Sequence, residues 1–152
     1  MISFRIFVTP LLVGMLAGCS NISKFENRPQ PGDAIVRCEN PKAGGLTAGD
    51  ASVFVEEIDG VATGFESNNV AYHVRPGKHR LALFVSTATM RQAREYFDLE
   101  AAAGRKYRLS AASKGRDFIV ALADDTNPKA IPIIATVELT ATVAYRPPAL
   151  AK

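Results

Sequence analysis

The 152-residue chain has no tryptophan, only two cysteines and only two histidines. It shows no nucleophile elbow, no nucleophile paired with a base, and no glycine-rich phosphate loop after a strand. The formal net charge is only +3, so charge gives no reason to expect a nucleic-acid partner. These absences favour a protein that is not an enzyme and that carries no cofactor.

A metal site is not expected either. The two histidines, His73 and His79, flank Pro76-Gly77, and a hairpin there would place them on opposite faces of a sheet. The carboxylates Glu56, Glu57 and Asp59 lie close in sequence and raise the possibility of acid–base work or cation binding. Glu56 and Glu57 alternate in direction on a strand, so we expect solvated charges near a turn.

The N-terminus has the order of a secretory signal. Residues 1–5 carry the terminal amine and one arginine, residues 6–15 are largely apolar, and small residues follow. The apolar run is interrupted by Pro10 and Gly14, and it is shorter than the roughly 20 residues that a membrane-spanning helix needs. The pattern therefore predicts a leader that is removed.

The run closes with Leu16-Ala17-Gly18-Cys19, which resembles the lipobox of bacterial lipoproteins. The resemblance implies a diacylglycerol on the Cys19 sulfur, cleavage just before Cys19, and usually a fatty acid on the new N-terminus. Two acyl chains are enough for stable membrane attachment. Ser20 follows, which by analogy with lipoprotein sorting implies the outer membrane, facing the periplasm. An ordinary signal peptide with Cys19 incidental remains the alternative.

Proline and glycine mark the expected boundaries of the mature chain. We expect one domain, preceded by a polar tether and followed by a loose tail that contains Pro147-Pro148. The expected divisions are a signal peptide at 1–18, a lipidated N-terminus and tether at 19–33, the folded domain at 34–145 and the tail at 146–152.

Cys38 is expected to be a lone thiol if Cys19 is lipidated. It shares its parity in a probable strand with Ala34 and Val36, which predicts a buried cysteine that packs as a small apolar residue. A redox-active or dimer-forming thiol is the alternative, and a Cys19–Cys38 disulfide requires that the lipobox interpretation is wrong.

Alternation of apolar and polar residues predicts strands from residue 51 onward. Val53 and Val55 alternate with polar neighbours before an Asp59-Gly60 turn. A hairpin is predicted over residues 70–85, with Val74 opposite His79. Its core face then comprises Val70, Tyr72, Val74, Leu81, Leu83 and Val85, and its other face Ala71, His73, Arg80 and Ala82.

Two more pairings follow in sequence. Residues 94–100 are predicted to pair with 106–112, placing Phe97 and Leu99 on one face with Tyr107, Leu109 and Ala111. The next hairpin turns at residues 113–116, where Gly115 can supply a positive φ, and its apolar face is Phe118, Val120 and Leu122. A helix over residues 90–103 is the alternative to the first of these pairings.

The longest alternation runs from Ile131 to Tyr145. It exceeds the usual length of about 5–6 residues for one strand, so we expect it to be bent or split. Pro132 is expected near its start or on a sheet edge.

Seven to eight short strands with regular turn signals predict a single antiparallel β-sandwich. The segments Val53–Gly60, Val74–Leu81 and Ala103–Leu109 resemble the PEGA-type and related domains of envelope lipoproteins. The resemblance covers roughly residues 50–125 and implies a small immunoglobulin-like or transthyretin-like sandwich. The Pro-Glu-Gly-Ala sequence that names the family is absent.

Residues 75–116 are rich in lysine and arginine, and Arg75, Lys78 and Arg80 are candidates for an anion-facing surface. We expect a non-enzymatic, membrane-anchored envelope lipoprotein that acts in protein or surface interaction, with another envelope protein or an anionic envelope surface as its partner. The alternative is a binding module for an anionic glycan or lipid. A convergent basic pocket would favour the alternative, and an exposed apolar patch or free strand edge would favour protein contact.

Overall fold

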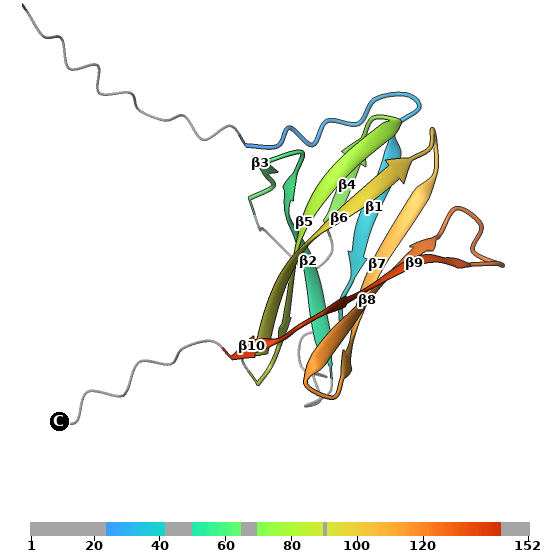
Figure 1. Cartoon of the computed structure of the whole chain (residues 1–152). Coiled ribbons are helices and arrows are strands. Elements are labelled where there is room, and N and C mark those ends of the chain that lie inside the picture. Colours follow the sequence, from blue (N-terminus) through green and yellow to red (C-terminus); the bar gives the residue numbers. More distant parts are fainter. Residues whose placement is uncertain (1–23, 42–49, 65–69, 90, 144–152) are drawn as a thin grey trace, which may run out of the picture.

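The structure, a computed structural model, describes residues 24–41, 50–64, 70–89 and 91–143, and it is a two-layer β-sandwich (Figure 1). Eight of its strands have four residues or more, which confirms the expected all-β sandwich of seven to eight strands. The strands are β1 (Ala34–Glu39), β2 (Ala51–Ile58), β3 (Val61–Ala62), β4 (Ala71–Val74), β5 (Gly77–Thr87), β6 (Arg91–Ala101), β7 (Lys106–Lys114), β8 (Asp117–Asp124), β9 (Ile133–Leu139) and β10 (Thr142–Val143).

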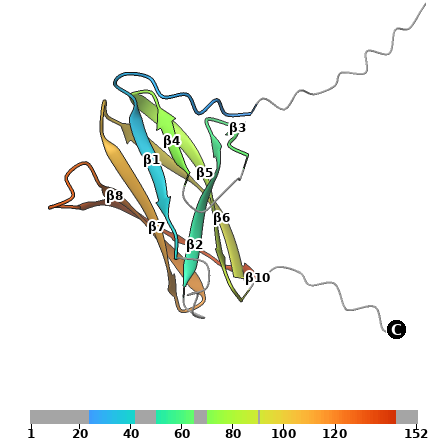
Figure 2. The ribbon, with the colours of Figure 1, turned by 180° about the vertical axis from the view of Figure 1, so that it is seen from behind.

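Each layer is a five-stranded sheet. The β1 sheet has the order β4-β1-β7-β8-β9, and the β5 sheet has the order β10-β6-β5-β2-β3. All pairs are antiparallel except β1 and β7, which run parallel with Val36 opposite Tyr107. The view from behind shows β1 and β7 side by side with β2 in the other layer (Figure 2).

The core lies between the sheets and is built by the period-two pattern of the strands. Leu81 and Leu83 from one layer and Leu109 and Phe118 from the other are fully buried. Full burial of an aliphatic or aromatic side chain contributes about 1.5–3 kcal/mol each. No buried side-chain nitrogen or oxygen within the described residues lacks a hydrogen-bond partner.

The expected hairpin over residues 70–85 is wrong in its pairing. β4 pairs with β1, where Val74 lies opposite Ala34, whereas β5 pairs with β2 and β6 and places His79 opposite Leu99. The chain crosses between the sheets at Arg75-Pro76, because Pro76 has no N–H for a hairpin ladder and Gly77 adopts φ 135°. Five of the six expected core positions are buried, namely Tyr72, Val74, Leu81, Leu83 and Val85. Val70 is half-buried and packs against the core.

The expected pairing of residues 94–100 with 106–112 is also wrong. β6 pairs with β5 and β10, whereas β7 pairs with β1 and β8. Leu99 and Tyr107 belong to opposite sheets and both point into the core, which explains their shared apolar parity. The alternative of a helix is wrong as well, because β6 is a continuous strand from Arg91 to Ala101. Met90 lies outside the described residues.

Two predicted hairpins are confirmed. β7 and β8 turn at Gly115, whose φ is 62°, with Lys114 opposite Asp117. Phe118, Val120 and Leu122 are buried, as the alternation predicted. β2 and β3 turn at Asp59-Gly60, where Asp59 itself has φ 54°.

The long C-terminal alternation is split, and its halves belong to different sheets. β9 extends the β1 sheet beyond β8, and after Thr140 and Ala141 the chain adds β10 to the β5 sheet (Figure 1). Leu139 is buried, but Ile133 and Ile134 at the start of β9 are exposed. Pro132 precedes β9 directly, and β9 is an edge strand.

Residues 24–33, expected in the tether, are instead held against one end of the sandwich (Figures 1 and 2). The Phe25 N–H donates to the Ala62 carbonyl at 2.8 Å, and the Phe25 ring meets Tyr72 edge-on at 6.2 Å. The expected signal peptide, the lipobox residues 16–19 and the expected C-terminal tail lie outside the described residues.

Candidate functional site

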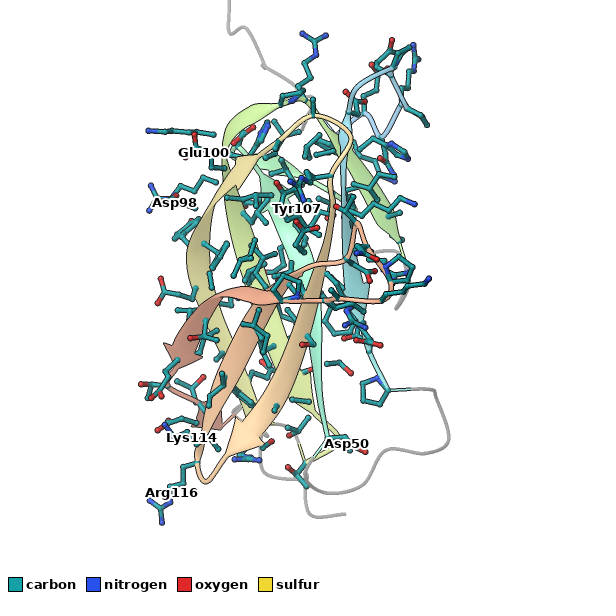
Figure 3. All side chains as sticks on the ribbon, turned by 90° about the vertical axis from the view of Figure 1, so that its right-hand side faces the viewer. Asp50, Asp98, Glu100, Tyr107, Lys114 and Arg116 are labelled. Carbon is teal, nitrogen blue, oxygen red and sulfur yellow. The ribbon has the colours of Figure 1, made fainter. Side chains whose placement is uncertain are left out.

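The basic residues Arg75, Lys78 and Arg80 do not converge on one pocket. All three are exposed, but Lys78 and Arg80 stand across from acidic residues of β6, with Lys78 opposite Glu100 and Arg80 opposite Asp98. Figure 3 shows Asp98 and Glu100 projecting from the outer face of the sandwich. Arg75 lies on the crossover and lines a different groove. The surface formed by Lys78 and Arg80 of β5 and by Asp98 and Glu100 of β6 therefore carries mixed charge.

The outer face of the β5 sheet is hollowed beside a β-bulge in β2. The register shifts so that Val55 lies opposite Leu83 and Glu57 opposite Ala82. The bulge turns Glu56 and Glu57 toward the same groove of about 910 Å³, so the expectation that they alternate in direction is wrong.

The groove is crossed by an internal ion pair. The Arg94 guanidinium lies 3.0 Å from the Glu56 carboxylate and 5.2 Å from the centre of the Phe84 ring. The carboxylates of Glu57 and Glu95 also line this groove.

His73 and His79 lie in different sheets, although both line a groove of about 400 Å³ beneath residues 24–33. His79 places Nδ1 2.7 Å from Asp59 Oδ2 and Nε2 2.6 Å from the Arg75 carbonyl oxygen. Among the described residues, no three His, Cys, Asp or Glu side chains are grouped to hold a metal ion. The His79 ring therefore has a structural role, because it joins Asp59 of the β2–β3 turn to the Arg75 carbonyl on the crossover.

The Asp59 carboxylate is held by the strand beside it. Burial pushes its pKa up, but the Arg80 backbone N–H, at 2.8 Å from Oδ1, and the His79 ring outweigh burial and set the pKa below its ordinary value of 3.8. Asp59 thus fastens the β2–β3 turn to β5.

Cys38 is buried, as predicted. Removal from water raises the pKa of its thiol to about 12, against a smaller lowering by a hydrogen bond with the Val55 backbone. The thiolate is the reactive form of cysteine, so this burial favours an inert packing role over redox chemistry.

Two asparagines cover strand edges on one side of the sandwich. At the outer edge of β4, Asn27 Nδ2 donates to the Ala71 carbonyl at 2.7 Å and its Oδ1 accepts from the His73 N–H at 2.8 Å. Asn40 holds Val53 of β2 in the same way, at 2.9 and 2.8 Å. Each amide takes the place of a neighbouring strand. The sequence held no signal for these contacts, because both asparagines read as loop residues.

Among the described residues, no strand or asparagine covers the opposite side of the sandwich. β9 is the outermost strand of its sheet, and within the same residues β10 pairs with β6 at Arg91 and Gln92 alone. β6 and β9 contact each other, so both free edges lie on one side. We call β9 together with residues 93–101 of β6 the open side. It includes Ile133 and Ile134, which are 64% and 51% exposed.

Comparison with protein-family models, curated proteins and solved structures found no significant match to this chain. Within the described ranges, no helix has the length and apolar character needed to cross a membrane. Because the comparisons indicate no site, we identify the candidate site from the strand arrangement alone, and it is the open side.

Proposed function

We propose that this chain is a lipid-anchored, non-enzymatic protein of the bacterial cell envelope that contacts another envelope protein through the β9 edge of the open side. The free edge of β9, with two adjacent exposed isoleucines, is the observation that carries the contact. The lipobox-like sequence at residues 16–19 supports the anchor, and Ser20 supports the outer membrane, facing the periplasm.

Protein contact fits this edge because an unpaired strand offers a row of backbone donors and acceptors. Ile133 and Ile134 add apolar area at the point where β9 bulges against β8, between Leu122 and Ala123. Exposed apolar residues beside a free edge are typical of a surface that another protein covers.

Mixed charge favours this function over an anionic glycan or lipid ligand. Lys78 and Arg80 each have a carboxylate directly across the strand pair, and Arg94 is bonded to Glu56. A surface whose cations are already matched attracts anions weakly, and salt screens the remainder.

The anchor is tested by fatty-acid labelling of the full chain in cells. The wild-type chain should incorporate a labelled fatty acid, and Cys19→Ala should abolish both labelling and processing, because the sulfur is the attachment point. Cys38→Ala is the matched control and should label normally. Labelling that survives Cys19→Ala contradicts the anchor.

The contact surface is tested with a photo-cross-linking amino acid in the full chain. Placed at Ile134, it should give one discrete cross-linked product with a different protein in intact envelopes. Placed at Arg116, which is exposed on the β7–β8 turn at the end of β8 opposite to the end that pairs with Ile133, it should not give that product (Figure 3). Equal products from both positions would contradict a contact at β9.

A further inference from the structure

We infer that the free edge of β6 (residues 93–101) is a self-pairing surface, on which a second copy of this chain adds its own β6 antiparallel to the first. The two β5 sheets would then form one continuous sheet across a twofold axis. This inference is independent of the proposed contact at β9, because it uses the other sheet of the open side.

The edge has backbone groups to offer. On an antiparallel strand, alternate residues direct N–H and C=O toward the same neighbour. The Tyr96 N–H faces away from β5, since it donates to its neighbouring carboxylate Glu95 at 2.9 Å. The even-numbered residues Arg94, Asp98 and Glu100 therefore also direct their backbone groups outward. The outward carbonyl of Glu100 also accepts a hydrogen bond from the Tyr107 hydroxyl at 3.3 Å, which leaves its second lone pair for a partner strand.

The length of the free edge fixes the register. β10 occupies β6 at Arg91 and Gln92, and β6 ends at Ala101. On the edge away from β5, no described strand therefore pairs with the stretch from Ala93 to Ala101, and its middle residue is Phe97. Two copies that pair over the whole stretch must place Phe97 opposite Phe97.

Side chains match in this register. On the outer face, Arg94 stands opposite Glu100 of the second copy, and the twofold axis makes this pair occur twice. Tyr96 stands opposite Asp98 of the second copy. On the inner face, the two half-buried Phe97 side chains meet at the axis. Cross-strand pairs of opposite charge and aromatic pairs both stabilise a sheet.

Neighbouring registers are worse. A shift by one step in one direction places Asp98 opposite itself, which sets like charges together. A shift in the other direction places Glu100 of the second copy opposite Gln92, where β10 already pairs. Charged edge residues discourage pairing with arbitrary strands, so a partner must match their pattern. The strand that matches is β6 itself.

The test is a symmetric disulfide in the full chain. Inner-face residues at the axis form a non-hydrogen-bonded pair with Cα atoms about 4.5 Å apart, within the range for a disulfide. Phe97→Cys should give a disulfide-linked dimer on a non-reducing gel after mild copper–phenanthroline oxidation of membranes. The unsubstituted chain sets the background from Cys19 and Cys38.

Glu95→Cys is the matched control. It lies on the same face of the same edge but faces Leu99 of the second copy, so it should not exceed the background. Glu95→Cys dimers as abundant as those of Phe97→Cys would overturn the register.

Charge reversal at positions 94 and 100 provides a second test of the register. Glu100→Arg in the Phe97→Cys chain should lower the dimer yield by roughly three- to tenfold. The new arginine stands opposite Arg94 of the second copy, and the twofold axis makes this repulsive pair occur twice. Adding Arg94→Glu with Glu56→Gln should restore the yield. Glu56→Gln is included because Glu56 is the present partner of Arg94. Lys129→Glu, on an exposed loop, should change nothing.

Sedimentation of the detergent-solubilised full chain with native Phe97 covers the case in which Phe97→Cys does not fold. The wild type should sediment as a dimer and Glu100→Arg as a monomer. A wild-type chain that stays monomeric overturns the self-pairing surface, whatever cross-links form at Ile134. If the chain dimerises but the cross-linking amino acid at position 134 gives no product with a different protein, the proposed function is overturned instead.

Discussion

His79 Nδ1 lies 2.7 Å from Asp59 Oδ2, and this contact ties the crossover between the two sheets to the turn between β2 and β3. The other ring nitrogen of His79 meets the Arg75 carbonyl oxygen at 2.6 Å. Asp59 Oδ2 and the Arg75 carbonyl oxygen are acceptors, so each of these two contacts is a hydrogen bond only when the facing ring nitrogen carries a proton. The side chain of His79 is 13% exposed and that of Asp59 is 50% exposed, so the contact lies at the surface with the imidazole ring mostly covered.

The Asp59 contacts predict a loss of stability in acid. The Asp59 pKa is lowered in the folded state, so its contribution is complete above the unfolded value of 3.8 and disappears as the pH falls through the folded pKa. We expect the urea concentration at the unfolding midpoint to decrease once the pH is lowered below about 4. Asp59→Asn should lower stability at neutral pH and flatten this acid dependence. An unchanged slope would show that other carboxyls, such as Asp124, dominate the acid response.

The core assignment of β5 predicts unequal effects of two truncations. Leu83 is fully buried, so Leu83→Ala should cost about 2–5 kcal/mol of unfolding free energy. His73 is half-buried on the outward-facing side of β4, so His73→Ala should stay within about 0.5 kcal/mol. Denaturant melts of both variants measure the difference. Equal losses would contradict the assigned faces.

The two asparagine caps predict local changes in hydrogen exchange. Asn27→Ala removes the acceptor of the His73 N–H and should speed exchange of that amide while leaving Val53 unchanged. Asn40→Ala should do the reverse, because its Oδ1 accepts from the Val53 N–H. Each variant is thus the control for the other. Each change should also cost about 1 kcal/mol of stability.

Burial of Cys38 predicts a slow thiol. With a pKa of about 12, almost none of the thiol is ionised at neutral pH, and the side chain is 7% exposed. Alkylation by iodoacetamide should be negligible in the native chain and rapid after denaturation. Fast alkylation of Cys38 without unfolding would contradict the packing.

The sequence determined most of the core positions, although Ile133, on the predicted apolar face of the last segment, is exposed. Alternation along each strand assigned Ala34, Val36, Leu81 and Leu109 to the interior, and all four are buried. This succeeds because the period of two is a local property of the strand, independent of which strand lies beside it.

The tertiary structure alone decided which strands pair. Val74 and His79 read as a hairpin across Pro76-Gly77, but they belong to different layers. Parity cannot separate two strands that pair side by side from two that face each other across a core, because both arrangements bury the same side chains. Partner choice depends on contacts far apart in the sequence, such as β1 beside β7.

The candidate site divides in the same way. The sequence by itself determined the all-β class, since this depends on local periodicity. The signal and lipobox at residues 1–19 stay predictions from the order of the residues. Only the tertiary structure decided that Asn27 and Asn40 cover one side, and that no other described strand lies beside the outer edges of β6 (residues 93–101) and β9. The physical reason is that an edge exists only once every strand has taken its neighbours.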